Sequence, residues 1–231
     1  MMSFSEILND FSKNLSKINL GGSFKELITN PLTLLTLIAC LIIFVLIIKT
    51  KNIKLDTKMI TTIGIALALT TVLNMIKIYK FPQGGGITIG AMVPIILVAF
   101  AYGPLVGMLT GFLFGIISLF LDPYILQPVQ VLFDYPLPYM ALGVAGFFRN
   151  KKLIGAAFAI FLKFLSHFIS GVVFFGSYAP SGMSPYLYSF LVNGSLVGID
   201  GLICIVILSL LPIKRLIKAM QSKNSVTRSI A

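Results

Sequence analysis

The sequence is short of the residues that mark metalloproteins and disulfide-bonded domains. Of its 231 residues seven are acidic, two are cysteines, one is a histidine and none is a tryptophan. Both cysteines, Cys40 and Cys204, lie inside apolar runs, which argues against a structural disulfide or a thiolate metal site. The single histidine, His167, has no second histidine or thiolate at a metal-ligand spacing, so we expect no metal here.

Catalytic and nucleotide-binding motifs are missing as well. No glycine-rich run is followed by Lys-Ser/Thr, which excludes ATP hydrolysis by this chain. There is no His-Glu-x-x-His or Gly-x-Ser-x-Gly pattern of a protease or hydrolase. The formal charge of +11 comes without any nucleic-acid-binding motif. We therefore expect a chain that is not an enzyme, needs no cofactor and has no nucleic-acid partner.

What the sequence does contain is apolar. It is 57% hydrophobic and 11% charged, whereas soluble domains are about 25% charged. The apolar residues form long blocks, as helices that cross a lipid bilayer require. The composition predicts an all-α integral membrane protein of one membrane domain. We place seven spans at about 32–48, 59–78, 87–101, 105–121, 133–148, 153–175 and 187–211.

The N-terminal residues 1–30 are polar and are predicted to form an amphipathic helix over about residues 4–18 that lies on the membrane surface and ends at Gly21-Gly22. A solvated extension is the alternative. Residues 31–50 then form an extra transmembrane helix. Its Leu37-Ile38-Ala39-Cys40 resembles a lipoprotein cleavage site, but eight apolar residues follow the cysteine, so we interpret it as an uncleaved helix.

Basic residues predict the orientation. If the seven spans alternate, 12 of the 18 basic residues fall on one side: near 49–58, at 149–152 and in a basic tail, 213–231. Assigning that side to the cytoplasm puts the N-terminus outside and the C-terminus inside. The segments 79–86, 122–132 and 176–186 then lie outside, and we expect binding chemistry there.

Asp134 is the leading candidate for a binding residue. It lies in the run Gln127–Tyr139, among aromatic rings, amides and prolines that suit a pocket for a flat cation. A merely solvated carboxylate is the alternative, but ionisable residues in membrane segments are usually functional.

The sixth span places Lys163, His167, Ser170, Gly171 and Phe174 on one helical face. His167 is either a ligand contact or a packing residue, and Gly171 is expected to open space beside it. Lys163 and a second buried charge, Asp200, are predicted at equal depth in neighbouring helices, so we hypothesise an ion pair between them.

Other candidates come from the remaining spans. The last span contributes Tyr186, Tyr188, Asn193 and Ser195 near its outer end; Asn193 either reads an aminopyrimidine edge or bonds another helix. In the second span the small residues Gly64, Ala68 and Val72 recur every four positions, a spacing that lets another helix approach closely. The spacing favours packing inside this chain, with a subunit interface as the alternative. The Gly84-Gly85-Gly86 run is interpreted as a flexible gate.

Three motifs resemble the thiamine-specific substrate-binding subunit, or S component, of energy-coupling factor (ECF) transporters. They are Phe81-Pro82-Gln83-Gly84-Gly85, the run from Gln127 to Leu137, and Ser166 to Phe175 followed by Tyr188 and Asn193-Gly194-Ser195. The resemblance covers about residues 58–212. It implies a six-helix S-component core, here with one extra N-terminal transmembrane helix.

The resemblance also implies a function. Such subunits bind their vitamin near the outer face of the bacterial plasma membrane and dock on a transmembrane coupling subunit with two ATP-binding-cassette ATPases. The family often stacks tryptophan on thiamine; this chain has none, and Phe175 falls where one such ring is expected. The implied thiamine contacts are Asp134, Tyr135, Lys163, His167, Gly171, Phe175, Tyr188 and Asn193, with a lid at Gln83, Gly84, Gly85 and Gly86 and a docking motif at Gly64 and Ala68.

A second hypothesis, from another class of transport protein, is the alternative to the S-component function. Asp134, His167, Lys163 and Asp200 would also suit the proton relay of a self-sufficient secondary transporter of a small cationic or aromatic solute. The absence of a visible inverted repeat counts against it.

Overall fold

The computed structural model describes residues 9, 12–13, 15–16, 20–29, 31–50, 55–81 and 85–221. Most of the amphipathic helix predicted for residues 4–18 lies outside them. The predicted helix end at Gly21-Gly22 is wrong, because these glycines belong to the first turn of α2 (Leu20–Thr29). A glycine ends a helix when its backbone adopts a non-helical conformation. Here α2 continues for seven residues beyond the two glycines.

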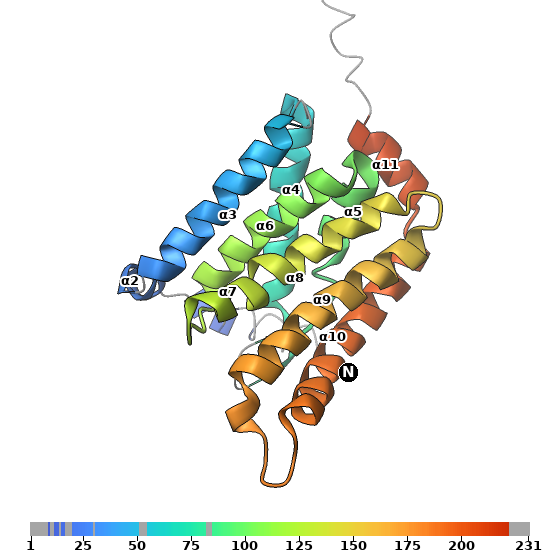
Figure 1. Cartoon of the computed structure of the whole chain (residues 1–231). Coiled ribbons are helices and arrows are strands. Elements are labelled where there is room, and N and C mark those ends of the chain that lie inside the picture. Colours follow the sequence, from blue (N-terminus) through green and yellow to red (C-terminus); the bar gives the residue numbers. More distant parts are fainter. Residues whose placement is uncertain are drawn as a thin grey trace, which may run out of the picture.

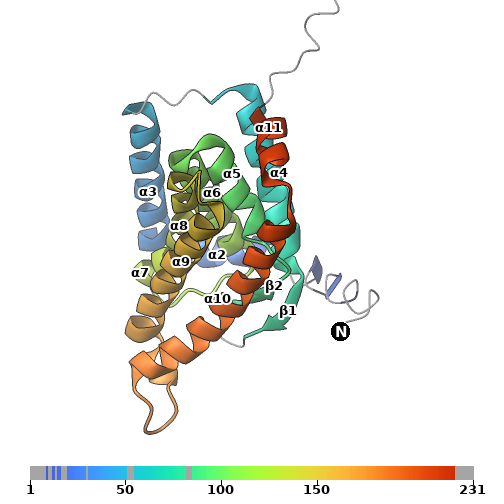
Figure 2. The same cartoon turned by 90° about the vertical axis from the view of Figure 1, so that its right-hand side faces the viewer.

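The molecule is a bundle of helices (Figures 1 and 2). Four helices are long and apolar enough to cross a membrane: α4 (Thr57–Met75), α6 (Pro104–Leu121), α9 (Lys152–Phe174) and α10 (Pro185–Leu210). α3 (Pro31–Thr50), with 20 residues, has the required length. The shorter, apolar α5 (Val93–Tyr102) is almost entirely buried. These elements confirm the all-α membrane architecture.

Local signals in the sequence fix several helix ends. Asp56 caps α4, its carboxylate accepting a 2.8 Å hydrogen bond from the backbone N–H of Met59. Ser184 caps α10 in the same way. Gly103 separates α5 from α6 with φ +97°, a left-handed conformation that favours glycine.

The predicted span at 133–148 is broken into three pieces: α7 (Pro128–Asp134), α8 (Pro136–Ala141) and the 3₁₀ helix η1 (Leu142–Phe147). Pro136 forces the break, because proline cannot continue a helical hydrogen-bond ladder. The neighbouring α6 packs backbone to backbone on this segment. A Cβ at Gly111 would stand 2.0 Å from the carbonyl oxygen of Tyr139, and one at Gly115 would stand 2.6 Å from that of Tyr135.

One part of the helix prediction is wrong. The spans predicted at 59–78 and 87–101 each include a strand: β1 (Lys77–Lys80) and β2 (Gly86–Thr88), which pair antiparallel with Tyr79 opposite Ile87. Periodicity does not separate a short apolar strand from the start of a buried helix, which explains the error. The hairpin lies at the end of the bundle that we call the cavity end (Figure 2).

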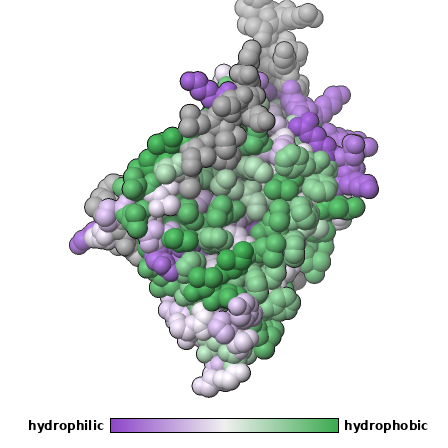
Figure 3. Space-filling view, in the orientation of Figure 1, coloured by the Kyte–Doolittle hydropathy of each residue, from purple (hydrophilic) through white to green (hydrophobic). Residues whose placement is uncertain are grey.

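The opposite end, the basic end, carries the exposed Arg149, Lys151, Lys214, Arg215 and Lys218. Figure 3 shows a band of apolar surface with hydrophilic residues gathered at this end. Here α11 (Ile213–Gln221), in the first half of the predicted basic tail, packs on α4 and α5.

Tyr102 joins α11 to the rest of the basic end. Its hydroxyl donates a 2.6 Å hydrogen bond to the carbonyl oxygen of Met220 in α11 and lies 3.2 Å from Oγ1 of Thr62 in α4. These contacts hold residues 213–221 against the bundle.

Candidate functional site

A cavity of about 160 Å³ lies at the cavity end, between the hairpin and the helices α7 to α10. Its walls include six of the described aromatic residues and five charged side chains, two lysines and three aspartates. Its polar and aromatic lining residues, together with Gly171, are Asn74, Lys77, Phe81, Thr88, Ser118, Asp122, Tyr124, Gln130, Asp134, Tyr135, Tyr139, Lys163, His167, Gly171, Phe175, Tyr188, Asn193 and Asp200.

Asp134 is held at the C-terminal end of α7 by its own helix. Gln130, one turn earlier and only 1% exposed, donates a 2.6 Å hydrogen bond from Nε2 to Oδ2 of Asp134. The Gln130 amide is itself fixed, because its Oε1 accepts from the N–H of Leu126 and its Nε2 also reaches the carbonyl of Tyr124. The carboxylate therefore has a defined position, as a preorganised binding group requires.

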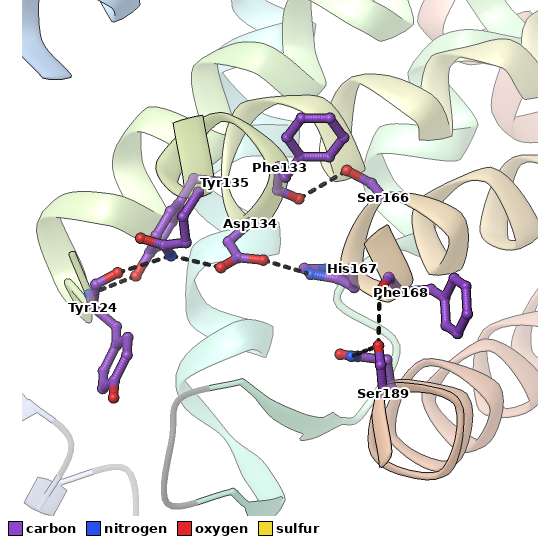
Figure 4. Close-up of polar contacts among 10 residues, drawn as sticks. Tyr124, Phe133, Asp134, Tyr135, Ser166, His167, Phe168 and Ser189 are labelled. Atoms are coloured by element: carbon purple, nitrogen blue, oxygen red, sulfur yellow. Dashed lines mark hydrogen bonds and ion pairs between the residues drawn. The ribbon is translucent and has the colours of Figure 1, made fainter. Parts of the chain in front are cut away.

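His167 faces Asp134 from the opposite wall. Its Nδ1 lies 3.5 Å from Oδ1 of Asp134, and each side chain is 19% exposed. Ser166, the preceding residue of α9, donates to the carbonyl oxygen of Phe133, which ties α9 to α7 beside this contact (Figure 4). The structure thus brings together the two residues that the sequence singled out first.

Tyr135 lines the cavity, but its hydroxyl is engaged elsewhere. The hydroxyl donates a 2.8 Å hydrogen bond to the carbonyl of Asp122. It also accepts a 2.7 Å bond from the N–H of Tyr124 (Figure 4). The side chain is 7% exposed. Its ring remains available to a ligand, while its polar tip holds the segment that follows α6.

The expectation that Gly171 opens space beside His167 is wrong. A Cβ at Gly171 would lie 2.3 Å from Oγ of Ser189 and 2.7 Å from Nδ2 of Asn193, so this glycine lets α10 approach α9 closely. Ser189 donates to the carbonyl of Phe168, and Asn193 donates to Ser189. Gly171 therefore sets the position of Asn193 in the wall of the cavity.

The hypothesised Lys163–Asp200 ion pair is also wrong: among the described residues no ion pair joins them. The Lys163 ammonium lies 4.7 Å from the centroid of the Tyr139 ring. One Asp200 oxygen, Oδ1, accepts from both the N–H (3.0 Å) and the hydroxyl (2.7 Å) of Thr88 in β2. The hairpin, which the sequence did not predict, supplies this partner. Both charges are buried and line the cavity.

Aromatic rings gather at one edge of the cavity. Phe175 stacks on Tyr124, with ring centroids 5.7 Å apart and planes at 29°, and lies 6.0 Å from Tyr178. The two tyrosine hydroxyls are 3.0 Å apart, and this hydrogen bond raises the pKa of Tyr124 above its ordinary value. Phe175 lies where the resemblance places a stacking ring. Tyr124 was missed, because a lone tyrosine in a loop carries no signal of its own.

Asp122 links the hairpin to the end of α6. Lys77 and Lys80 of β1 approach its carboxylate at 2.9 and 3.1 Å. Burial opposes ionisation of this carboxyl, but the two ammonium groups outweigh it and lower the pKa of Asp122. Asp122 could have been singled out, since acidic residues are few in this chain.

The predicted lid is only partly described, because Gln83 and Gly84 lie outside the described residues. Gly85 has φ +74°, which favours glycine, and Gly86 belongs to β2. A Cβ at Gly86 would stand 2.4 Å from the carbonyl oxygen of Tyr79, so the paired strands need glycine there. At Gly86 the interpretation as a flexible gate is therefore wrong: this glycine is part of a sheet.

The remaining candidate residues fall into two groups, those that line the cavity and those that are exposed on the surface. Tyr188 and Asn193 line the cavity, whereas Tyr186 is 65% exposed and Ser195 is exposed on the outer face of α10. Gly64, Ala68 and Val72 are exposed along one face of α4, and a Cβ at Gly64 would meet no atom within 4 Å. Packing inside this chain, which their spacing favoured, does not explain them.

Fold and site together define a multi-pass membrane protein with a polar, aromatic-lined cavity at one end of its bundle. A family model described as thiamine transporter protein matches residues 60–220, and the chain belongs to this family.

Two curated relatives, both named thiamine transporter ThiT, are similar in sequence. The protein from Bacillus subtilis is 33% identical over 168 residues, 64% of this chain and 87% of its own. The one from Lacticaseibacillus paracasei is 31% identical over 140 residues, 52% of this chain and 70% of its own. A solved structure of ThiT from Listeria monocytogenes aligns with a TM-score of 0.62 at 23% identity, over 69% of this chain and 96% of that one, and shows the same fold.

Proposed function

We propose that this protein is the thiamine-binding S component of an ECF importer, which captures the vitamin in the cavity and releases it inward when docked on its energising partners. The proposal is supported by the family, by the names of the two curated relatives and by the chemistry of the cavity. The observation that carries it is the fixed carboxylate of Asp134 among aromatic rings.

The charges of the cavity suit a single positive charge. Its lining holds Lys77 and Lys163 against Asp122, Asp134 and Asp200, so three carboxylates minus two ammonium groups leave one negative charge when His167 is neutral. Asp122 is engaged by two lysines and Asp200 by Thr88. Asp134 has a neutral amide and an imidazole as partners, which leaves its charge for the thiazolium of thiamine.

Flat rings would hold the rest of the ligand. Phe175, Tyr188 and Tyr139 line the cavity, and each stacked ring contributes cation–π or aromatic attraction of about 0.5–2 kcal/mol. Asn193 and His167 offer both hydrogen-bond donors and acceptors, which suit the amino group and ring nitrogens of an aminopyrimidine. Gly171 lines the cavity and lets α10 place Asn193 in its wall.

Docking on the partners is assigned to α4. The exposed Gly64 and Ala68 form a smooth strip on which another transmembrane helix can approach closely. The partners would be the transmembrane coupling subunit and two ATP-binding-cassette ATPases. With the basic end in the cytoplasm, the N-terminus and the cavity face outward.

The test uses purified protein in two settings. Calorimetric titration with thiamine should give one site per chain; no binding would overturn the proposal. The protein alone in liposomes should bind thiamine without accumulating it, and uptake should require the partner subunits and ATP. Proton-driven uptake by the protein alone would instead support a secondary transporter, for which the 3.5 Å contact between His167 and Asp134 would be the relay.

A further inference from the structure

The helix pair α2–α3 packs against the parts of α6 and α7 that carry the acidic side of the cavity. α3 contacts α7, and α2 contacts both α3 and α6. Leu37 of α3 belongs to one buried apolar cluster with Leu119 of α6, Val131 of α7 and Tyr135 at the junction of α7 and α8. The cluster therefore joins α3 to two walls of the cavity.

Leu37 is one of the two buried residues among those of α3 whose exposure the structure describes; the other is Thr33. Leu37 is 7% exposed. Other large apolar side chains of α3 whose exposure the structure describes are at least 40% exposed: Leu32, Leu34, Leu35, Ile38, Leu41, Ile42 and Val45. Most of the α3 side chains whose exposure is described are therefore exposed, and the buried pair Thr33 and Leu37 lies in the first half of the helix.

α7 needs external support for a physical reason. It has seven residues, fewer than a helix requires to be stable by itself, and Pro136 prevents its continuation. Gln130 and Asp134, four residues apart, line the cavity, while Val131, the residue after Gln130, is buried in the cluster with Leu37. Tyr135 belongs to both the cavity lining and the cluster. The packing of Val131 and Tyr135 in the cluster therefore fixes the direction in which Gln130 and Asp134 point.

The pair α2–α3 precedes the part of the chain that the family model matches, which begins at residue 60. The Listeria structure is 96% covered by an alignment that spans only 69% of this chain. The contact of Leu37 with α7 is therefore a feature of this chain that the comparisons do not supply.

We propose that α2–α3 is a brace for α7, and that Leu37 is a positioning residue for the Gln130–Asp134 pair. The part of this proposal that concerns the release of thiamine rests on the proposed function. With the brace loosened, α7 shifts relative to α9, the carboxylate loses its fixed place opposite His167, and bound thiamine leaves faster.

The experiment compares the full-length protein with four variants. Leu37→Ala removes the contact, Leu37→Met restores most of the volume, and Leu35→Ala changes an exposed leucine (62%) on the same helix. The fourth variant, Leu208→Ala, creates a cavity in the hydrophobic core beside α10, away from the site. Each is measured for the thiamine off-rate, for the thermal midpoint without ligand, and for amide hydrogen exchange of residues 128–135 without ligand.

Leu37→Ala should raise the off-rate roughly three- to tenfold, the scale found for mutations that touch neither ligand, and should speed exchange in residues 128–135. Leu37→Met should restore both values and Leu35→Ala should leave them unchanged. Leu208→Ala should lower the thermal midpoint without changing the off-rate. If Leu37→Ala behaves like Leu35→Ala, or lowers only the thermal midpoint, the brace is wrong. Because hydrogen exchange is measured without thiamine, it tests the brace even if thiamine does not bind.

Discussion

Gln130 and Asp134 form a 2.6 Å hydrogen bond along one turn of α7, with the amide as donor and the carboxylate as acceptor. The amide is buried and has two further partners, so it holds the carboxylate without moving itself. A carboxylate fixed in this way loses little conformational entropy on binding a cation, which favours tight binding.

Asp134→Asn should weaken thiamine binding about 10- to 100-fold, because hydrogen bonds to charged groups contribute about 1.5–3 kcal/mol. Calorimetry measures the dissociation constant. Asp56→Asn is the matched control: the same change at the N-cap of α4, where asparagine caps equally well, should leave binding unaltered. Unchanged affinity of Asp134→Asn would remove the charge argument.

Gln130→Leu and Gln130→Glu separate orientation from charge at the amide. Leucine removes the donor, and we expect a roughly threefold to tenfold weaker affinity. Glutamate places a second negative charge beside Asp134, so its effect should be larger than that of leucine. Equal losses in the two variants would show that charge at this position is irrelevant to binding.

Gly171→Ala should weaken thiamine binding, since the added methyl group would stand 2.3 Å from Ser189 and 2.7 Å from Asn193. We expect a rise in the dissociation constant of tenfold or more, with a lower thermal midpoint from the separation of α9 and α10. Gly198→Ala on α10, where a Cβ meets nothing within 4 Å, is the control: it should leave the dissociation constant unchanged and should not lower the thermal midpoint, because alanine favours a helix more than glycine does. Equal behaviour of the two variants would contradict the packing role of Gly171.

The Lys77–Asp122–Lys80 contact predicts a pH dependence. Its lowered pKa means that Asp122 contributes stability above its unfolded value, near 3.8, and that this contribution is lost as the pH falls through the lower folded value. The contribution is small, about 0–1 kcal/mol, because the carboxylate is 40% exposed. Thermal midpoints of the wild type and Asp122→Asn should differ at pH 7 and converge below pH 3.8. A constant difference would show that the ion pair does not cause it.

Gly64→Leu should leave thiamine binding by the isolated protein unchanged, because this residue faces away from the cavity on α4. Uptake with the partner subunits should fall sharply, since a large side chain prevents close helix approach. Thr57→Leu, an exposed change at the N-terminus of α4, serves as the control. Full uptake by Gly64→Leu would place docking elsewhere.

Much of this protein could be predicted from residue patterns. The apolar blocks near 105–121, 153–175 and 187–211 correspond to α6, α9 and α10 within two residues at each end. Asp134 and His167 could be singled out because ionisable side chains are rare in such segments. The prediction failed where an apolar segment is too short to show a period. The hairpin β1–β2 was missed, and with it the contact of Thr88 with Asp200.

The sequence by itself determined the membrane-spanning class, the order of the helices and the identity of the charged residues, because these follow from local composition and from the cost of placing charge in lipid. Only the tertiary structure decided which residues contact one another. Asp200 bonds Thr88 from 112 positions away, Lys77 reaches Asp122, and Leu37 shares a buried cluster with Val131. Such pairings depend on how helices far apart in the chain pack together, which no local pattern records.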